Sequence, residues 1–287
     1  MSFQVTEAFV TQFSANFYHL SQQSESRFES KVVVESGIVG ESKKMNRIGA
    51  TAAQRKTTRH GDTPLIETPH STRYIDLDDY EWADLVDELD KKKMLADPSS
   101  AYLKAGVAAM NRSKDDVIIA AMNGSARSSS GGVALPAAQK IAHGSAGLTK
   151  AKLITARKNF RTNECDGENG EELYIAYTSE QLEDVLNDTT LTDTQYNTVV
   201  SMMSGDIPKG QKLFGFGVVP SERITNNGTS DLALAWAKSG VALGIGAEIT
   251  TRLTERADKS YAMQPYACMS LGAVRIEDAK VVQIACN

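Results

Sequence analysis

The chain is poor in the residues that build disulfide frameworks and metal centres. Its 287 residues include three cysteines, Cys165, Cys268 and Cys286, and only four histidines. An odd and widely spaced set of cysteines does not make a disulfide framework, and a structural zinc site needs closer pairs of ligands. We therefore expect the three thiols to behave as small buried hydrophobic groups, and we expect neither a metal nor a cofactor.

The sequence also lacks a long apolar run. No segment approaches the roughly 20 apolar residues that span a bilayer. Residues 1–20 have neither the basic start nor the unbroken apolar stretch of a signal peptide. We therefore expect no membrane partner, and we expect synthesis and folding in a cytoplasm. With 41% hydrophobic and 23% charged residues, the composition is ordinary for a globular protein that buries a sizeable core.

No credible catalytic constellation stands out. The tripeptide Arg59-His60-Gly61 is similar to the Arg-His-Gly signature of histidine phosphatases, whose histidine takes the phosphoryl group. In that family a buried hydrophobic strand precedes the signature, whereas the polar run 53–58 precedes it here. A short motif counts only in its structural context. We therefore expect no enzyme and keep a histidine phosphatase as a remote alternative.

Charge is distributed unevenly along the chain. The net charge of −5 argues against a protein whose main task is to grip nucleic-acid phosphates. Residues 43–59 contain no acid and six bases, namely Lys43, Lys44, Arg47, Arg55, Lys56 and Arg59. Residues 76–90 contain no base and eight acids, namely Asp76, Asp78, Asp79, Glu81, Asp84, Asp87, Glu88 and Asp90. Two neighbouring blocks of opposite sign are more informative than the net charge.

The first 77 residues lack a core of their own. Residues 4–28 predict an amphipathic helix with the apolar face Phe9, Val10, Phe13, Phe17 and Leu20. An isolated helix needs a partner to bury such a face. Residues 31–77 consist of two strand-like pieces around a long polar excursion. Because such a segment is unusual inside a compact domain, we interpret it as a projecting hairpin.

Helices follow, and strands dominate the end of the chain. Acids near residue 78 and bases near residue 93 predict a helix over 78–93. Asp97-Pro98-Ser99 and Asn123-Gly124 predict the start and end of a helix over 98–122, which would be about 37 Å long. Residues 124–148 are interpreted as a loop. Further helices are predicted near 149–161, 179–186 and 193–203, and strands near 172–178, 215–220, 249–253 and 280–286. The fold class is α+β.

This order of elements resembles the coat-protein fold of tailed bacteriophages, which encapsulin shells share. The segment 174–186 is similar to the strand, cap and helix that open the axial domain of that family. The segment 214–224 resembles the strand that follows, and 272–284 resembles the closing strands. One variant of the family joins subunits covalently through a hairpin lysine and an asparagine, and no matching pair is recognisable here.

The resemblance implies the Hong Kong 97-type capsid fold. Its parts would be an N-terminal arm over 1–30, an extended hairpin loop over 31–77, a peripheral domain with the spine helix over 78–164, an axial domain over 165–245, and a return to the peripheral domain over 246–287. The implied function is that of a major capsid protein, which forms the hexamers and pentamers of an icosahedral shell around double-stranded DNA. An encapsulin-like compartment is the close alternative.

The same resemblance implies the partners and the contact surfaces. The partners would be further copies of the chain, scaffolding and portal proteins, and weakly contacted DNA, in a virion capsid assembled in the cytoplasm of a host bacterium. We expect the arm to serve assembly through Phe9, Phe13 and Phe17 and to contribute little to the fold of its own subunit. We hypothesise that the six bases of the hairpin meet Asp84, Asp87 and Glu88 of a neighbour.

Overall fold

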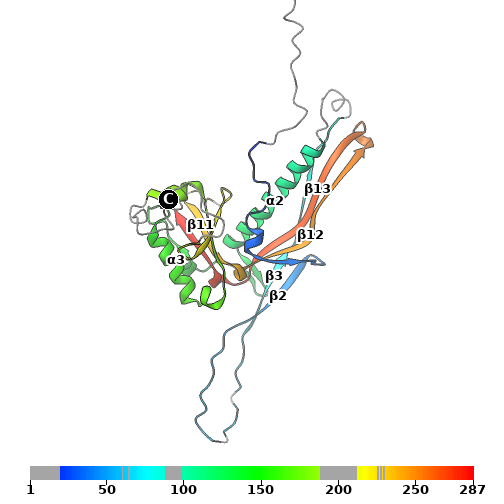
Figure 1. Ribbon diagram of the computed structural model, residues 1–287. Coiled ribbons are helices and arrows are strands. Elements are labelled where there is room, and N and C mark those ends of the chain that lie inside the picture. Colours follow the sequence, from blue (N-terminus) through cyan, green and yellow to red (C-terminus); the bar gives the residue numbers. More distant parts are fainter. Residues whose placement is uncertain are drawn as a thin grey trace, which may run out of the picture. The chain divides into compact units, whose positions relative to one another are not determined.

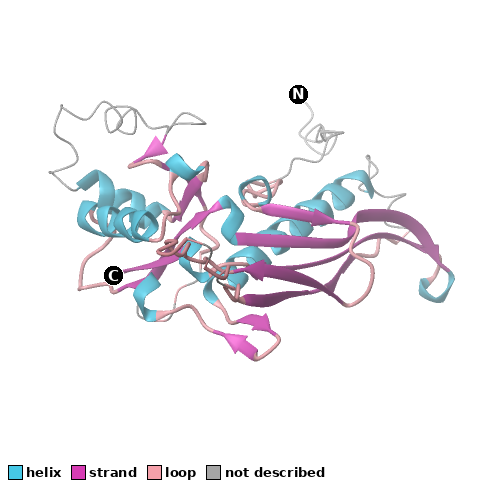
Figure 2. Ribbon diagram, turned by 90° about the horizontal axis from the view of Figure 1, so that it is seen from below, coloured by secondary structure: helices cyan, strands magenta, loops and turns pink. Residues whose placement is uncertain are grey.

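The computed structural model describes residues 20–59, 61–63, 65–87, 99–187, 212–224, 226, 228 and 230–287. The chain forms two compact units. The smaller unit draws on residues 1–25, 79–112 and 248–269, and the larger unit on residues 26–78, 113–247 and 270–287. Four elements have residues in both units, namely β4 (Asp78–Ala83), α2 (Ser99–Asn123), β12 (Val241–Arg256) and β13 (Ala262–Arg275). The structure confirms the predicted mixture of helices and sheets (Figure 2).

Helix α2 confirms the long helix predicted from its start and end signals. It runs over Ser99–Asn123, against the predicted 98–122. In the smaller unit, Trp82 of β4 (Asp78–Ala83) packs against Gly106 of this helix, where an added Cβ would clash with the indole ring. Glycine costs helix propensity, so its presence here is explained by the close approach of the tryptophan.

A four-stranded sheet has the order β1–β12–β13–β4. Strand β1 (Val33–Ser36) runs parallel to the start of β12, with Val33 opposite Ala242 and Ser36 opposite Ile245. The side chains of β13 alternate: Pro265, Ala267, Met269 and Leu271 are buried, and Gln264, Tyr266, Cys268 and Ser270 are half-buried. This period of two shows that one face of the strand is covered and the other is more open.

A second four-stranded sheet has the order β2–β3–β5–β6. Its strands are β2 (Ser42–Ile48), β3 (His70–Asp76), β5 (Ala126–Ser128) and β6 (Gly131–Val133). Strands β2 and β3 are antiparallel, in a register that pairs Ser42 with Asp76 and Ile48 with His70. The chain between them projects beyond the strand ends as a long loop, as predicted for a projecting hairpin (Figure 1). The first strand of the hairpin is β2 and not the predicted strand-like piece near residue 31, which forms β1 and pairs with β12.

The third sheet has six strands in the order β7–β14–β11–β8–β10–β9. They are β7 (Lys140–Ile141), β14 (Val281–Cys286), β11 (Asp231–Ala237), β8 (Leu173–Tyr177), β10 (Phe216–Pro220) and β9 (Lys212–Leu213). Helices α3 (Lys150–Thr162) and α4 (Ser179–Asn187) pack on one face of this sheet. Phe160 of α3 and Val185 of α4 share a core there with Ile175, Ala235 and Ile284. Short 3-10 turns occupy Glu29–Lys31, Ala137–Gln139, Gly167–Asn169, Lys238–Gly240, Ala257–Lys259 and Asp278–Lys280.

Several predicted elements are wrong or lie outside the described residues. The helix over 78–93 is wrong, because residues 78–83 form strand β4; residues 88–98 are outside the described ranges. The loop over 124–148 contains the short strands β5, β6 and β7. Residues 20–28 are not helical, and the rest of the predicted helix 4–28 is outside the described ranges, as is the predicted helix 193–203. Within the described ranges, no helix is long and apolar enough to cross a membrane.

Candidate interaction surfaces

The loop of the β2–β3 hairpin is exposed throughout. Every described residue from Gly49 to Pro69 is exposed, and the apolar side chains of Leu65 and Ile66 are 94% and 43% exposed. Ile48, at the end of β2, is 71% exposed. A segment with no burial of its own cannot repay the entropy of ordering it. Surfaces outside this chain are therefore the natural place for these side chains to be buried.

Four of the six hairpin bases are free in this structure. Lys44, Arg55, Lys56 and Arg59 are exposed, and none of them forms an ion pair with any described residue. These four charges are therefore available to bind a partner, as the charge pattern of the hairpin predicts.

The other two bases are engaged within the chain. The Lys43 ammonium lies 2.7 Å from a carboxylate oxygen of Glu35 in β1. Arg47 donates one hydrogen bond to the Ser71 hydroxyl at 3.1 Å and another to the Ile276 carbonyl at 2.5 Å. The hypothesis that all six bases pair with acids of a neighbour therefore does not hold for Lys43, which has a partner in its own chain. It overlooked Glu35, which comes before the basic block in sequence.

The acidic block is split between internal contacts and open surface. Asp76 pairs with Arg127 at 2.5 Å, and Glu81 accepts a hydrogen bond from the Tyr266 hydroxyl at 3.0 Å. Asp78 and Asp79 are exposed and form no ion pair with any described residue. The remaining members are Asp84 and Asp87, which are exposed, and Glu88 and Asp90, which lie outside the described ranges.

The structure does not bring the two charge blocks together. Among the described residues, no ion pair joins one of the six hairpin bases to an acid of the block 76–90. The side chains of Phe9, Phe13 and Phe17 lie outside the described ranges. Within one copy of the chain, the described members of the two blocks are therefore not paired with each other.

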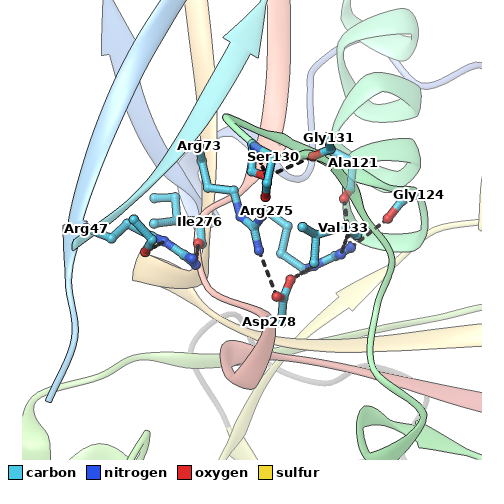
Figure 3. A network of polar contacts seen from close by, with 12 residues as sticks. Arg47, Arg73, Ala121, Gly124, Ser130, Gly131, Val133, Arg275, Ile276 and Asp278 are labelled. Carbon is cyan, nitrogen blue, oxygen red and sulfur yellow. Dashed lines mark hydrogen bonds and ion pairs between the residues drawn. The ribbon is translucent and has the colours of Figure 1, made fainter. Parts of the chain in front are cut away.

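A buried arginine network joins the base of the hairpin to the end of α2 (Figure 3). The Arg275 guanidinium is fully buried, and it donates to the carbonyls of Met122 and Gly124 at 3.0 and 2.8 Å and to Val133 at 2.9 Å. It also pairs with Asp278 at 2.6 Å. A cation at this position complements the partial negative charge at the helix C-terminus.

Asp278 holds a second arginine, from the hairpin itself. Arg73 of β3 is 2% exposed, and its guanidinium lies 2.8 Å from the other carboxylate oxygen of Asp278. Burial lowers the pKa of Arg73, Asp278 acts in the opposite direction, and Arg47 and Arg275 add repulsion. One carboxylate thus fixes strand β3 to the turn that follows β13. Sequence reasoning did not find this network, because its members are dispersed along the chain.

The segment before β1 is part of the core of the larger unit. Phe28 is fully buried, and its ring stacks on that of Trp236 with the centroids 5.5 Å apart. The buried carboxylate of Asp115 in α2 accepts hydrogen bonds from the Ser26 hydroxyl at 2.5 Å and from the Arg27 amide at 3.0 Å. The expectation that the N-terminal segment, residues 1–28, contributes little to the fold is therefore wrong for residues 26–28.

The surroundings of Arg59 do not match a phosphatase site. The residues before it, 51–58, are exposed and contain no strand, so they do not form the buried strand that precedes the nucleophile in that family. His60 lies outside the described ranges. Among the residues that the structure describes, no three histidine, cysteine, aspartate or glutamate side chains are grouped as metal ligands.

Comparisons with known proteins agree on one family. A family model described as phage capsid protein matches residues 5–287. The structure is similar to the capsid of the cyanophage P-SCSP1u, with a TM-score of 0.78 and 14% identity over 100% of this chain and 95% of that chain. It is also similar to the capsid of Ralstonia phage GP4, with a TM-score of 0.72 and 10% identity over 97% and 95% of the two chains.

A capsid of a native GTA particle has the same fold. The TM-score is 0.74, and the identity is 9% over 99% of this chain and 97% of that chain. No curated protein matches the sequence.

Proposed function

The chain belongs to the phage capsid protein family, and from this premise we propose that it assembles into hexamers and pentamers that close as an icosahedral shell around double-stranded DNA. It is a structural major capsid protein of a tailed phage, with the Hong Kong 97-type fold, and its place is the virion capsid. The observation that carries the proposal is the β2–β3 hairpin. Its loop is exposed along its whole described length, and four of its bases form no ion pair with any described residue.

The hairpin is the element that reaches a neighbouring subunit. Its exposed apolar groups, Ile48, Leu65 and Ile66, need a surface that the chain itself does not supply. The free acids Asp78 and Asp79, with Asp84 close by, offer a surface of opposite charge on the next copy. Each exposed ion pair contributes only about 0–1 kcal/mol. Shell stability therefore comes from the repetition of modest contacts around closed rings.

The remaining parts of the proposal follow from charge and from the type of subunit. An acidic subunit holds DNA weakly, which lets packaged DNA slide. Scaffolding and portal proteins are further partners, and assembly takes place in the cytoplasm of the host bacterium. The chain is not an enzyme. An assay with a chromogenic phosphate ester should detect no hydrolysis by the protein, and hydrolysis that His60→Ala abolishes would contradict this.

The experiment that tests the proposal reverses the free bases. A variant with Lys44→Glu, Arg55→Glu and Lys56→Glu should keep the unfolding transition of the parent and form few closed shells in electron micrographs. A control with Lys104→Glu, Arg252→Glu and Lys259→Glu changes the net charge equally at exposed positions of the smaller unit, and it should assemble. Adding Asp78→Lys, Asp79→Lys and Asp84→Lys to the hairpin variant should partly restore shells. Normal assembly of the hairpin variant at low salt would refute the hairpin contact, and a parent protein that forms no closed shells would refute the proposed function.

A further inference from the structure

Helix α3 carries charge of one sign only. The segment Lys150–Thr162 contains Lys150, Lys152, Arg157, Lys158 and Arg161 and no acid, although the whole chain is acidic. Lys152 is buried, and its ammonium donates to three backbone carbonyls between 2.5 and 2.9 Å. Lys158 and Arg161, by contrast, are exposed. The helix therefore uses one base for its own fold and presents others to the outside.

The exposed bases of α3 border a groove with an apolar floor. The groove has a volume of about 400 Å3, and it is lined by Ile154, Arg157, Lys158, Arg161, Thr162 and Phe214. Ile154 is 49% exposed, which is unusual for an isoleucine in a packed helix. Arg161 has only long contacts, 3.9 Å to Asp166 and 3.7 Å to Glu168. Apolar groups beside exposed cations favour an acidic polypeptide surface as the partner.

Helix α4 carries the complementary charge. Glu180 and Glu183 are exposed, and neither forms an ion pair with any described residue. The neighbouring Asp184 is engaged, because its carboxylate accepts a hydrogen bond from the Leu148 amide at 3.0 Å. Helices α3 and α4 pack on the same face of the six-stranded sheet. This layer of each copy thus contains a basic groove and an acidic ridge.

We propose that the α3 groove of one copy receives the acidic ridge, Glu180 and Glu183, of a second copy in the same ring. A ring of identical subunits needs two different surfaces that complement each other, one on each side of the subunit. The groove and the ridge carry opposite charges, as two such surfaces require. The proposal rests on the proposed assembly into rings, and it adds a contact that is independent of the hairpin.

Charge reversal on each side tests this contact. In purified subunits at low salt, Lys158→Glu with Arg161→Glu should weaken ring formation at least tenfold, as measured by sedimentation velocity. Glu180→Lys with Glu183→Lys should have an equal effect. The four changes together should recover most of the loss, because the pairs form again with exchanged signs. Lys104→Glu with Arg252→Glu is the control of equal charge change, and every variant should unfold like the parent.

Other outcomes would contradict the contact between the α3 groove and the acidic ridge. If Lys158→Glu with Arg161→Glu forms rings normally but loses retention on immobilised DNA, the basic face serves nucleic acid instead. If the combined variant is not restored, Glu180 and Glu183 are not the partner surface. If both the α3 variant and the α4 variant form rings normally while the hairpin variant forms no closed shells, this inference is wrong and the proposed function stands. A parent protein that forms neither rings nor shells overturns both.

Discussion

At the scale of single residues, Asp278 and Arg275 connect segments that are far apart in sequence. Arg275 donates to two carbonyls at the end of α2 and to the Val133 carbonyl of β6, and Asp278 pairs with both Arg275 and Arg73. Two buried guanidinium groups thus depend on one carboxylate. Removing one partner of a buried ion pair destabilises a protein far more than the intact pair stabilises it, because the remaining charge stays buried without a counter-charge.

Removal of that carboxylate should destabilise the subunit strongly. Asp278→Ala leaves Arg73 and Arg275 buried without a counter-charge, and we expect a loss of about 3–5 kcal/mol in the free energy of unfolding. Urea unfolding of the subunit measures it. The control is Asp258→Ala, which breaks the exposed pair with Arg256 and should change stability little. Similar losses in the two variants would show that burial does not matter at Asp278.

The buried hydroxyl of Tyr177 predicts a loss of stability in alkali. Burial raises the pKa of Tyr177 from 10.0 to about 12. Below pH 10 both the folded and the unfolded chain keep this proton. As the pH rises from 10 to 12, the unfolded chain loses it first, so the contribution of this group to stability declines across that window. A shift of this size corresponds to at most about 3 kcal/mol.

Tyr177→Phe isolates this effect. The variant should lose less free energy of unfolding than the parent between pH 9 and pH 12, measured by urea unfolding at each pH. Tyr261→Phe, at an exposed tyrosine, is the control and should follow the parent. If Tyr177→Phe declines as steeply as the parent, the hydroxyl does not behave as a buried acid.

At the scale of elements, the segment before β1 has two parts. Residues 1–19 lie outside the described ranges, and residues 26–28 are attached to the core of the larger unit. Deleting residues 1–19 should leave the unfolding transition of the subunit nearly unchanged. Deleting residues 1–28 also removes Phe28 from its stack on Trp236 and takes the donors of residues 26–28 away from the buried Asp115. We expect the longer deletion to cost at least the roughly 3–5 kcal/mol typical of losing a core phenylalanine.

A point variant serves as the control for that deletion. Phe28→Ala in the full chain should reproduce most of the loss, measured by thermal and urea unfolding. Equal destabilisation by the deletions 1–19 and 1–28 would show that the residues before position 20 belong to the core as well.

Elements with local signals could be predicted, and elements decided by long-range pairing could not. Helix α2 has an N-cap, a proline and a terminal Asn-Gly pair in the sequence, and its bounds were predicted within one residue. The segment 78–83 has acids at the start of an apparent helical stripe, yet it forms β4. There Tyr80 and Trp82 are half-buried and alternate with exposed neighbours. Pairing with β13 makes the segment 78–83 a strand. No local sequence signal predicts that pairing.

At the scale of the whole molecule, the sequence was enough to predict a capsid subunit, but it did not predict which distant segments of the chain contact each other. Strand β1 pairs with β12, a partner about two hundred positions away in the chain, with Val33 opposite Ala242. The two strands pair because both are buried in the same sheet, and a single sequence does not show which distant segments lie side by side. For the same reason, the partner of Lys43 within the chain was missed, while the free charges of Lys44, Arg55, Lys56 and Arg59 were anticipated from the absence of acids nearby.

Assembly should depend on salt more strongly than folding does. The contacts proposed between subunits involve exposed charges on the hairpin loop, on β4, on α3 and on α4. The Debye length falls from about 10 Å at 0.1 M salt to about 3 Å at 1 M, so exposed charges are screened. The core of each subunit is made of buried apolar groups and a buried arginine network, which salt screens much less.

We therefore expect 1 M sodium chloride to slow the assembly of purified subunits at least tenfold and to leave their unfolding midpoint almost unchanged. Light scattering follows the first quantity and circular dichroism the second. The hairpin variant with Lys44→Glu, Arg55→Glu and Lys56→Glu should assemble slowly at every salt concentration, because screening removes an attraction that this variant no longer has. Equal assembly rates of the parent at 0.05 M and 1 M salt would mean that apolar contacts, and not the charged surfaces, control association.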